Sequence, residues 1–327
     1  MNLKKNWDPT VLGSLPTYFL SLFKAPIGII EDLEKIRRKF LWGGCEDKRK
    51  IHWVSWDRVI APKAVGGLGV GSIRAQNLAL LIKWWWKLKD DPTAIWSRSI
   101  SCIHNLGNKP LDYISKKSMT GVWKNIAGVQ ADLEVLGLNF YDIFKQVLNS
   151  GDKTLFWYDN WLGGGKLLHL YPRLFEMESK KRCLVKDRVK VEGHSWRWKS
   201  ALGMEGLDGD LNCFMADLAP VQLKEGSDHI ACKLTEDGNY RVDVIRKSID
   251  HNQTLCPLQS KIKWSEIIPL KISCFLWRAI VGKIPSAVAL CHRGWRSIPL
   301  AATPALPVLI MSITASSSAP LLVILET

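Results

Sequence analysis

The segment from Ser72 to Leu88 constrains the fold of this chain more than any other part of its sequence. Its spacing predicts a helix whose apolar residues fall on most of its sides. These residues are Ile73, Leu78, Leu80, Leu81, Ile82, Trp84, Trp85, Trp86 and Leu88. A helix without a polar face has to be enclosed by other elements of the fold. The sequence therefore predicts a helical core around this segment, with Ser72 as the N-cap.

The three consecutive tryptophans of this segment allow two interpretations. Their rings could stack nucleic-acid bases, since every base presents a flat aromatic face. Successive residues of a helix point about 100° apart, however, so Trp84, Trp85 and Trp86 cannot form one platform. We therefore expect the triplet to pack in the core.

Two further helices are predicted before this segment, over about residues 11–50. Ser14 can cap the first, which begins at Leu15-Pro16, and Pro26 opens the second, which ends at Gly43-Gly44. Apolar residues recur at helical spacing in the second: Ile27, Ile30, Leu33, Ile36, Phe40 and Leu41. The other face and the loop that follows are basic, with Lys35, Arg37, Arg38, Lys39, Lys48, Arg49 and Lys50. This strip is a candidate contact surface for phosphates, although an ordinary solvated helix face has the same composition.

Two glycine-rich stretches match nucleotide-binding motifs only in part. Residues 66–71 contain part of a dinucleotide fingerprint, but Pro62 and Lys63 stand where a buried strand should lead in, and no βαβ unit surrounds the stretch. We predict a tight turn there instead. The loop Gly163-Gly164-Gly165-Lys166 lacks the GxxxxGK[ST] spacing of a phosphate-binding loop, and Leu167 replaces the hydroxyl residue. Neither stretch predicts a nucleotide cofactor or a small-molecule substrate.

The second half of the chain carries β-structure signals and a second basic run. Thr154–Tyr158 is rich in residues that favour strands. Residues 229–234 and 240–244 flank a turn at Glu236-Asp237-Gly238, which predicts a hairpin. The basic run consists of Lys180, Lys181, Arg182, Lys186, Arg188 and Lys190. We predict an α+β fold, predominantly α-helical in the N-terminal half, with small β-hairpin elements in the second half and a disordered or apolar C-terminal tail.

The character of the C-terminal part changes at Arg296. A helix is predicted before it by apolar residues at helical spacing: Ile272, Phe275, Leu276, Trp277 and Ile280. Residues 297–325 carry no charged side chain and contain four prolines. This span is long enough for a membrane anchor, but the prolines and Ser316-Ser317-Ser318 disfavour a continuous helix. A membrane partner is therefore disfavoured.

The charge balance favours a polyanionic partner. Lys and Arg number 45 against 31 Asp and Glu, which gives a net charge of +14 and a pI near 9.4. A basic excess of this size favours nucleic acid or an acidic membrane face. The alternative is a solvated basic surface without such a partner. At 327 residues and 47% hydrophobic content, the chain is long enough for two or three small domains.

The eight cysteines do not predict a local metal site. They are Cys45, Cys102, Cys183, Cys213, Cys232, Cys256, Cys274 and Cys291. No two are closer than 17 residues, so the chain has no CxxC pair. The N-terminal residues lack the apolar core of a signal peptide. We therefore expect a reducing intracellular compartment, nuclear or cytoplasmic, with free thiols that lie mostly in the core.

Several blocks of the sequence, in order over about residues 11–296, resemble the C-terminal region of plant LINE-type (non-LTR) retrotransposon reverse transcriptases. They are Phe40-Leu41-Trp42-Gly43-Gly44, the run from Lys50 to Trp56, the stretch from Gly66 to Trp86 and the run from Gly151 to Trp161. A further set resembles the start of the reverse-transcriptase zinc-binding domain: Trp264, Pro269-Leu270-Lys271-Ile272, Phe275-Leu276-Trp277-Arg278, Lys283-Ile284-Pro285 and Arg293-Gly294. Each block alone is weakly specific, and together they are specific.

The resemblance implies the RNA-directed DNA polymerase family, and two departures separate this chain from it. The family's catalytic turn, an aromatic residue followed by Ala-Asp-Asp, seats two divalent metals and is absent here. The only adjacent Asp pair, Asp90-Asp91, precedes Pro92 and predicts a helix cap. The family's zinc-binding domain continues into a CxxC pair and later a His and a Cys, but no Cys, His or Asp follows His292. We interpret the residues after 296 as out-of-frame translation or as sequence from beyond a splice error.

We predict four regions along the chain. Residues 1–150 form a helical post-polymerase region similar to a thumb or connector, and 151–260 a mixed α+β linker region with the hairpin. Residues 261–296 form a truncated start of the zinc-binding domain, and 297–327 an unrelated tail. The predicted function is that of a non-catalytic fragment that binds RNA or DNA without sequence preference. It has no predicted catalytic residue, metal ligand or cofactor, since zinc is expected only in the intact family domain. The alternatives are an active component of an RNA-directed DNA polymerase and a protein-interaction module with a membrane-anchoring tail.

Overall fold

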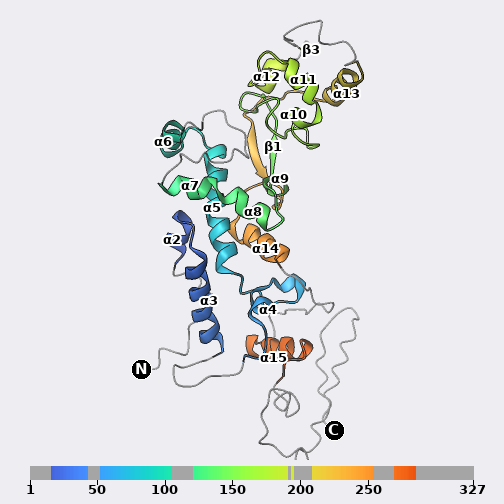
Figure 1. Ribbon diagram of the computed structural model, residues 1–327. Coiled ribbons are helices and arrows are strands. Elements are labelled where there is room, and N and C mark those ends of the chain that lie inside the picture. Colours follow the sequence, from blue (N-terminus) through green and yellow to red (C-terminus); the bar gives the residue numbers. More distant parts are fainter. Residues whose placement is uncertain are drawn as a thin grey trace, which may run out of the picture. The chain divides into compact units, whose positions relative to one another are not determined.

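The computed structural model describes residues 16–42, 52–104, 106, 121–190, 193–194, 208–253 and 269–284 of the chain (Figure 1). The chain divides into two compact units, Met1–Ile262 and Lys263–Thr327. The described residues are mostly helical and include two small antiparallel sheets of two strands each. This agrees with the predicted helical character of the first half and with the small amount of β structure predicted for the second.

Helix α5 (Ile73–Asp90) is the centre of the first unit. Ser72 caps it as the sequence predicts, because its side chain accepts a hydrogen bond from the Ala75 N–H at 3.0 Å. Trp85 is only 1% exposed, and the tryptophans on either side of it are half-buried against the same core. The prediction of a core helix is therefore confirmed, and the tryptophan triplet serves packing.

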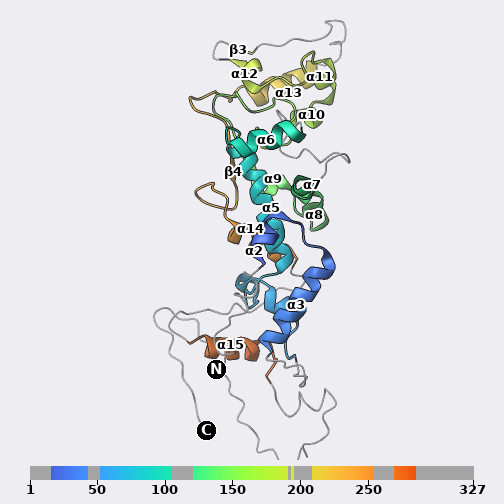
Figure 2. The ribbon, with the colours of Figure 1, turned by 90° about the vertical axis from the view of Figure 1, so that its left-hand side faces the viewer.

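Helices from the beginning, middle and end of the first unit pack against α5. They are α2 (Thr17–Leu22), α3 (Ile27–Leu41), α7 (Gly121–Ala127), α8 (Val129–Val135) and α14 (Val242–Asn252). Both views show α2 and α14 beside α5 (Figures 1 and 2). Pro16 and Pro26 directly precede α2 and α3, as predicted, since proline fits the start of a helix. The predicted cap Ser14 lies outside the described residues.

Four further elements complete the helical core of this unit. They are α4 (Trp56–Ile60), the 3-10 turn η1 (Lys63–Val65), α6 (Ile95–His104) and α9 (Phe140–Ile143). Asp91, at the end of α5, accepts hydrogen bonds from the Thr93 and Ala94 N–H groups at 3.2 and 3.1 Å. These bonds turn the chain towards α6 and agree with the predicted capping role of this residue.

The strand pairing corrects the predicted hairpin. Strand β1 (Phe144–Val147) pairs antiparallel with β4 (His229–Cys232), with Phe144 opposite Cys232 and Val147 opposite His229. The predicted turn exists, since the Cys232 N–H donates to the Gly238 carbonyl at 2.7 Å. The second predicted strand, 240–244, is wrong, because α14 begins at Val242. The signal for the turn lies in neighbouring residues. The strand that pairs with β4, however, is β1, more than 80 residues earlier in the chain.

The excursion between β1 and β4, residues 148–228, has a core of its own, which we call the aromatic lobe. Its elements are α10 (Leu167–Leu170), α11 (Pro172–Met177), α12 (Val185–Arg188), β2 (Val189–Lys190), β3 (Gly193–His194) and α13 (Asp208–Leu218). Trp157 stacks on Phe214 with ring centroids 5.7 Å apart, and both side chains are fully buried beside Phe156. The predicted strand 154–158 is wrong: Leu155 forms one isolated bridge to Leu184, and residues 156–158 form a turn. Aromatic residues serve here as core anchors rather than as a strand.

The second unit contains helix α15 (Leu270–Ile280), which begins after Pro269 and confirms the helix predicted there. Trp277 is buried, whereas Leu270 and Phe275 are exposed. Residues 285–327, which include the tail interpreted as out of frame or as a membrane anchor, lie outside the described part of the chain. Among the helices that the structure describes, none combines the length and the apolar character needed to cross a bilayer.

Candidate nucleic-acid interface

The first predicted basic strip lies on α3, and the structure divides it between two faces. Lys35 and Lys39 are exposed and Arg38 is half-buried, but Arg37 is only 3% exposed. Conversely, Ile36, predicted to face the core, is 54% exposed. The placement of Arg37 on the solvent-facing side of the helix is therefore wrong. The remaining members of the strip lie outside the described residues: Lys48, Arg49 and Lys50.

Arg37 points inwards because Glu34, one turn earlier on α3, offers it a buried carboxylate. The Nη1 atom of Arg37 lies 2.9 Å from Oε2 of Glu34. Its Nη2 atom donates to the carbonyl oxygens of Gly71 at 3.1 Å and Val70 at 3.4 Å. Burial lowers the pKa of the Arg37 guanidinium, and the neighbouring carboxylate opposes that shift. A buried arginine stays charged, so these acceptors are what makes its burial tolerable.

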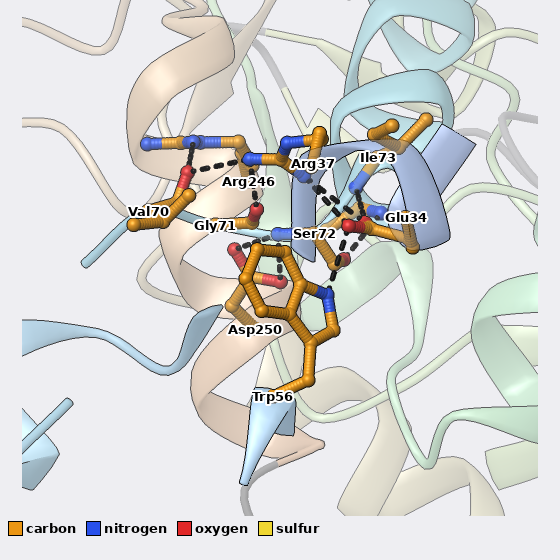
Figure 3. A network of polar contacts seen from close by, with 10 residues as sticks. Glu34, Arg37, Trp56, Val70, Gly71, Ser72, Ile73, Arg246 and Asp250 are labelled. Carbon is orange, nitrogen blue, oxygen red and sulfur yellow. Dashed lines mark hydrogen bonds and ion pairs between the residues drawn. The ribbon is translucent and has the colours of Figure 1, made fainter. Parts of the chain in front are cut away.

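Glu34 collects donors from three helices, which we call the Glu34 network (Figure 3). Besides Arg37, it accepts a hydrogen bond from Nε1 of Trp56 on α4 at 2.9 Å. It also accepts one from the Ile73 N–H in the first turn of α5 at 2.8 Å. The first N–H groups of a helix have no partner within the helix, and a carboxylate is favoured at that end. The network thus fixes α3 and α4 to the start of the central helix.

Asp250 on α14 approaches the same helix start from another side. Its carboxylate accepts from the Ser72 N–H at 3.2 and 3.4 Å. One turn earlier, Arg246 donates to the Val70 carbonyl at 3.2 Å. Burial raises the pKa of Asp250 to about 6, although its hydrogen bonds with Ser72 and the Arg246 charge oppose the shift. Both buried carboxylates, Glu34 and Asp250, were missed at the sequence level, because nothing near them in the chain identifies their partners.

The glycine-rich turn before α5 is closed by its own backbone. The Gly69 N–H donates to the Ala61 carbonyl at 2.8 Å, and the Gly71 N–H donates to the Ile60 carbonyl at 2.9 Å. A side chain on Gly67 would overlap the Ala61 carbonyl, so glycine is required there by the close approach of the backbone. These amides cap the end of α4 and the residues after it, in line with the predicted tight turn.

The second basic run leads into α12 of the aromatic lobe. Lys180, Arg182 and Lys186 are exposed. Lys181 is half-buried, with its Nζ 4.5 Å from the centroid of the Phe175 ring. A cation over an aromatic face is held in place but keeps its charge. This short stretch therefore presents several positive charges together, as predicted.

Arg188, the fifth member of this run, is buried and does not face solvent. Its Nη2 and Nε atoms donate to the two carboxylate oxygens of Glu178 at 2.6 and 3.0 Å. The two side chains are 3% and 0% exposed. Glu178 also accepts from the Lys180 N–H at 2.9 Å. The predicted exposure of Arg188 is therefore wrong, since a two-point carboxylate contact holds it inside. The side chain of Lys190 lies outside the described part of the chain.

Asp228 is another buried carboxylate that the sequence did not reveal. It accepts hydrogen bonds from the N–H groups of Asn149, Gly151, Lys153 and Thr154 at 2.8, 2.9, 3.1 and 3.2 Å. Burial acts to raise its pKa, but these backbone donors prevail and hold the pKa of Asp228 below its usual value. The carboxylate thereby fastens the two ends of the aromatic lobe to each other.

The described part of the chain contains no group of three or more His, Cys, Asp or Glu side chains that could hold a metal ion. Cys183 and Cys232 are buried, as predicted for core cysteines, and burial raises the pKa of the Cys183 thiol to about 11. Cys102 and Cys213 are exposed. Three cysteines lie outside the described residues: Cys45, Cys256 and Cys291.

Comparison with known proteins adds two relatives. No protein-family model matches the chain, and no solved structure matches it. The chain is 25% identical, over 274 residues, to an Arabidopsis thaliana protein named "Putative ribonuclease H protein". That match covers 82% of this chain and 42% of the relative, so the chain spans less than half of that protein's length. It is also 27% identical, over 150 residues, to an uncharacterized mitochondrial protein of Arabidopsis thaliana, covering 46% of this chain and 93% of the relative.

Proposed function

We propose that this chain is a retroelement-derived protein that binds RNA or DNA through exposed basic side chains and has no polymerase activity of its own. Two similarities of the sequence support this proposal. The sequence blocks resemble plant retrotransposon reverse transcriptases. The similarity to a protein named for ribonuclease H covers 82% of the chain, and that name refers to an activity on nucleic acid.

The observation that carries the binding proposal is the net charge of +14. Each internal ion pair removes one positive and one negative charge, so pairing leaves the excess unchanged. The buried pairs Arg37–Glu34 and Arg188–Glu178 are therefore neutral overall, and the surplus lies on other side chains. A surplus of this size attracts a polyanion over a range of several ångströms at physiological salt.

The exposed members of the two basic runs are the candidates for phosphate contacts. On α3 they are Lys35 and Lys39, and in the aromatic lobe they are Lys180, Arg182 and Lys186. Two of the five already have a carboxylate within reach: Lys35 pairs with Asp32, and Lys180 pairs with Asp187. Such exposed pairs are weak, so a phosphate can replace the carboxylate.

The absence of polymerase activity is proposed from the sequence alone. Two-metal nucleotidyl transfer needs carboxylates placed to hold both ions, and this sequence contains no aromatic-Ala-Asp-Asp turn. Its adjacent pair includes Asp91, whose Oδ1 already accepts from Thr93 and Ala94. A primer-extension assay on the purified chain is expected to give no product, and template copying would contradict this part of the proposal.

Binding is tested by fluorescence anisotropy with labelled single-stranded and double-stranded RNA and DNA at increasing salt. The logarithm of affinity is expected to fall linearly with the logarithm of salt concentration. The triple variant Lys180→Gln, Arg182→Gln, Lys186→Gln should lower the slope for single strands by roughly 2, since each lost phosphate contact removes about 0.7.

The matched control is the triple variant Lys124→Gln, Lys145→Gln, Lys224→Gln. These lysines are also exposed, and their replacement changes the net charge by the same amount. An equal loss in both variants would show that only total charge matters and would reject the basic run as the contact site. Binding that does not respond to salt, or no binding at all, would reject the nucleic-acid proposal itself.

A further inference from the structure

Two ring contacts join four side chains between the end of α3 and the segment from His52 to the start of α4, and we call these four side chains the ladder. Trp42 caps the C-terminal end of α3 and lies one turn after Arg38, and its N–H donates to the Arg38 carbonyl at 3.2 Å. The facing segment contributes His52 and Trp56. The Trp42 and His52 rings stack with centroids 6.1 Å apart and planes 23° apart. The Arg38 guanidinium carbon lies 5.7 Å from the centroid of the Trp56 ring.

The inner end of this ladder is fixed. Trp56 is 8% exposed, and its Nε1 donates to Glu34 of the Glu34 network. The guanidinium of Arg37 lies over the same ring at 5.7 Å. Trp56 is thus held by the protein interior and in turn holds Arg38 against its face. An arginine stacked in this way loses little conformational freedom when it binds a ligand.

The outer members of the ladder reach the protein surface. His52 is exposed, Trp42 and Arg38 are half-buried, and Lys39 is exposed next to Arg38. Arg38 and Lys39 stand in the last turn of α3, where positive charge also compensates the negative end of the helix dipole. The surface therefore combines an aromatic face with two cations, one of them held in position.

We propose that this ladder binds an unpaired base of single-stranded nucleic acid, which stacks on the exposed His52 ring, itself stacked on Trp42, while Arg38 and Lys39 contact the flanking phosphates. The proposal rests on the proposed nucleic-acid binding and adds a defined subsite and a preference for single strands. Bases in a duplex are stacked on each other and expose only their edges, so a ring face can accept only an unpaired base. The contact does not read sequence, since every base has such a face.

The test separates stacking from charge by using three probes of equal length. They are a fluorescein-labelled uridine dodecamer, an abasic deoxyribose-phosphate dodecamer and a duplex RNA. His52→Ala should weaken binding of the uridine strand by roughly 5- to 150-fold, the range of one lost base stack. Binding of the abasic strand and of the duplex should stay unchanged. His52→Phe keeps a ring and should bind the uridine strand as the wild type does.

Two further variants complete the design. His251→Ala removes an exposed histidine from the last turn of α14 and should leave all three affinities unchanged. Arg38→Lys keeps the charge but not the planar group stacked on Trp56, and it should weaken binding of the uridine and abasic strands alike. Thermal unfolding of each variant shows whether the fold is kept.

The outcomes separate this inference from the proposed function. Salt-dependent binding of all probes with no effect of His52→Ala would overturn the stacking subsite and leave the proposed function standing. An equal loss for the uridine and abasic strands would also overturn it, because no base contact would then be involved. Failure of the wild type to bind any probe would overturn both.

Discussion

The two buried glutamate–arginine pairs, Glu34–Arg37 and Glu178–Arg188, differ in where the other hydrogen-bond donors to the glutamate come from. Glu34 reaches Trp56 on α4 and the start of α5, so its carboxylate joins elements that are distant in sequence. Glu178 and Arg188 lie ten residues apart in the aromatic lobe, and the further donor to Glu178, the Lys180 N–H, belongs to the same lobe.

The difference shows that a buried glutamate–arginine pair can join several helices, as Glu34–Arg37 does, or can stabilise a single lobe from within, as Glu178–Arg188 does. A buried ion pair adds little net stability compared with well-packed apolar residues, but removing one partner leaves an unpaired charge and is strongly destabilising. The effect should be confined to the lobe for the second pair and should spread over α3, α4 and α5 for the first. Two substitutions test this contrast, and a third tests Asp250, the buried carboxylate next to the first pair.

Glu178→Ala is expected to have the largest effect. It leaves the Arg188 guanidinium buried, with 3% exposure, without its two carboxylate contacts, and should cost about 3–5 kcal/mol of unfolding free energy. Urea unfolding measures the loss, and hydrogen exchange should place it within residues 154–189. Glu176→Ala, at an exposed position of α11, is the control and should be close to neutral. Faster exchange throughout α5 instead would contradict a lobe-confined role.

Glu34→Ala should destabilise somewhat less, by about 2–4 kcal/mol. Arg37 keeps two acceptors, the carbonyls of Val70 and Gly71, and the Glu34 side chain is 12% exposed against 0% for Glu178. Exchange should increase in α4 and at the start of α5, where Trp56 and Ile73 lose their acceptor. Glu31→Ala, exposed on the same helix, is the matched control. An increase restricted to α3 would refute the view that Glu34 links helices.

Asp250→Asn should have the smallest effect on stability, and the effect should appear in how the unfolding free energy depends on pH. The pKa of Asp250 is about 6 in the folded state, against about 3.9 in an unfolded chain. Between these values the folded state binds more protons, so Asp250 makes stability fall as pH rises from about 4 to about 6. The variant removes this contribution. The unfolding free energy of the wild type minus that of the variant should therefore change by about 2 kcal/mol across that window.

The control for the pH experiment is Asp243→Asn on the same helix. Surrounding groups hold the pKa of Asp243 below its usual value: burial acts to raise it, but hydrogen bonds from Lys247 and Arg241 prevail. Its contribution to stability is therefore lost as pH falls, which is opposite in sign to that of Asp250. Stability curves of wild type and Asp250→Asn that run parallel from pH 4 to pH 7 would contradict the raised pKa.

What the sequence predicted well depends on signals within a few residues. Ser72 precedes a long apolar run, and Pro26 precedes α3, so the start of each helix could be placed. The turn ending at Gly238 was recognised for the same reason, since Asp-Gly favours a positive φ and this glycine has a φ of 71°. In each case the residues that determine the structure are neighbours in the chain.

What the sequence missed depends on partners that are far away. The face of α3 was misjudged because Arg37 is a surface residue by type, and only the positions of Glu34 and Gly71 in the fold make its burial favourable. The same holds for Arg188 in the second candidate run. The exposed lysines of both runs were placed correctly, since they need no partner to stay in water. The sequence thus predicted the positive charge of the candidate interface. It did not predict which of its cations are exposed and which are buried.

The pairing of β1 with β4 has a topological consequence. The chain leaves the helical core at Val147 and re-enters it at His229, and these two residues are paired directly in the β1–β4 sheet. The 148–228 segment is therefore an insertion whose two ends lie next to each other. A short hairpin turn could replace it without moving either strand. Such an arrangement lets the inserted part grow, shrink or be exchanged while the register of the core is kept.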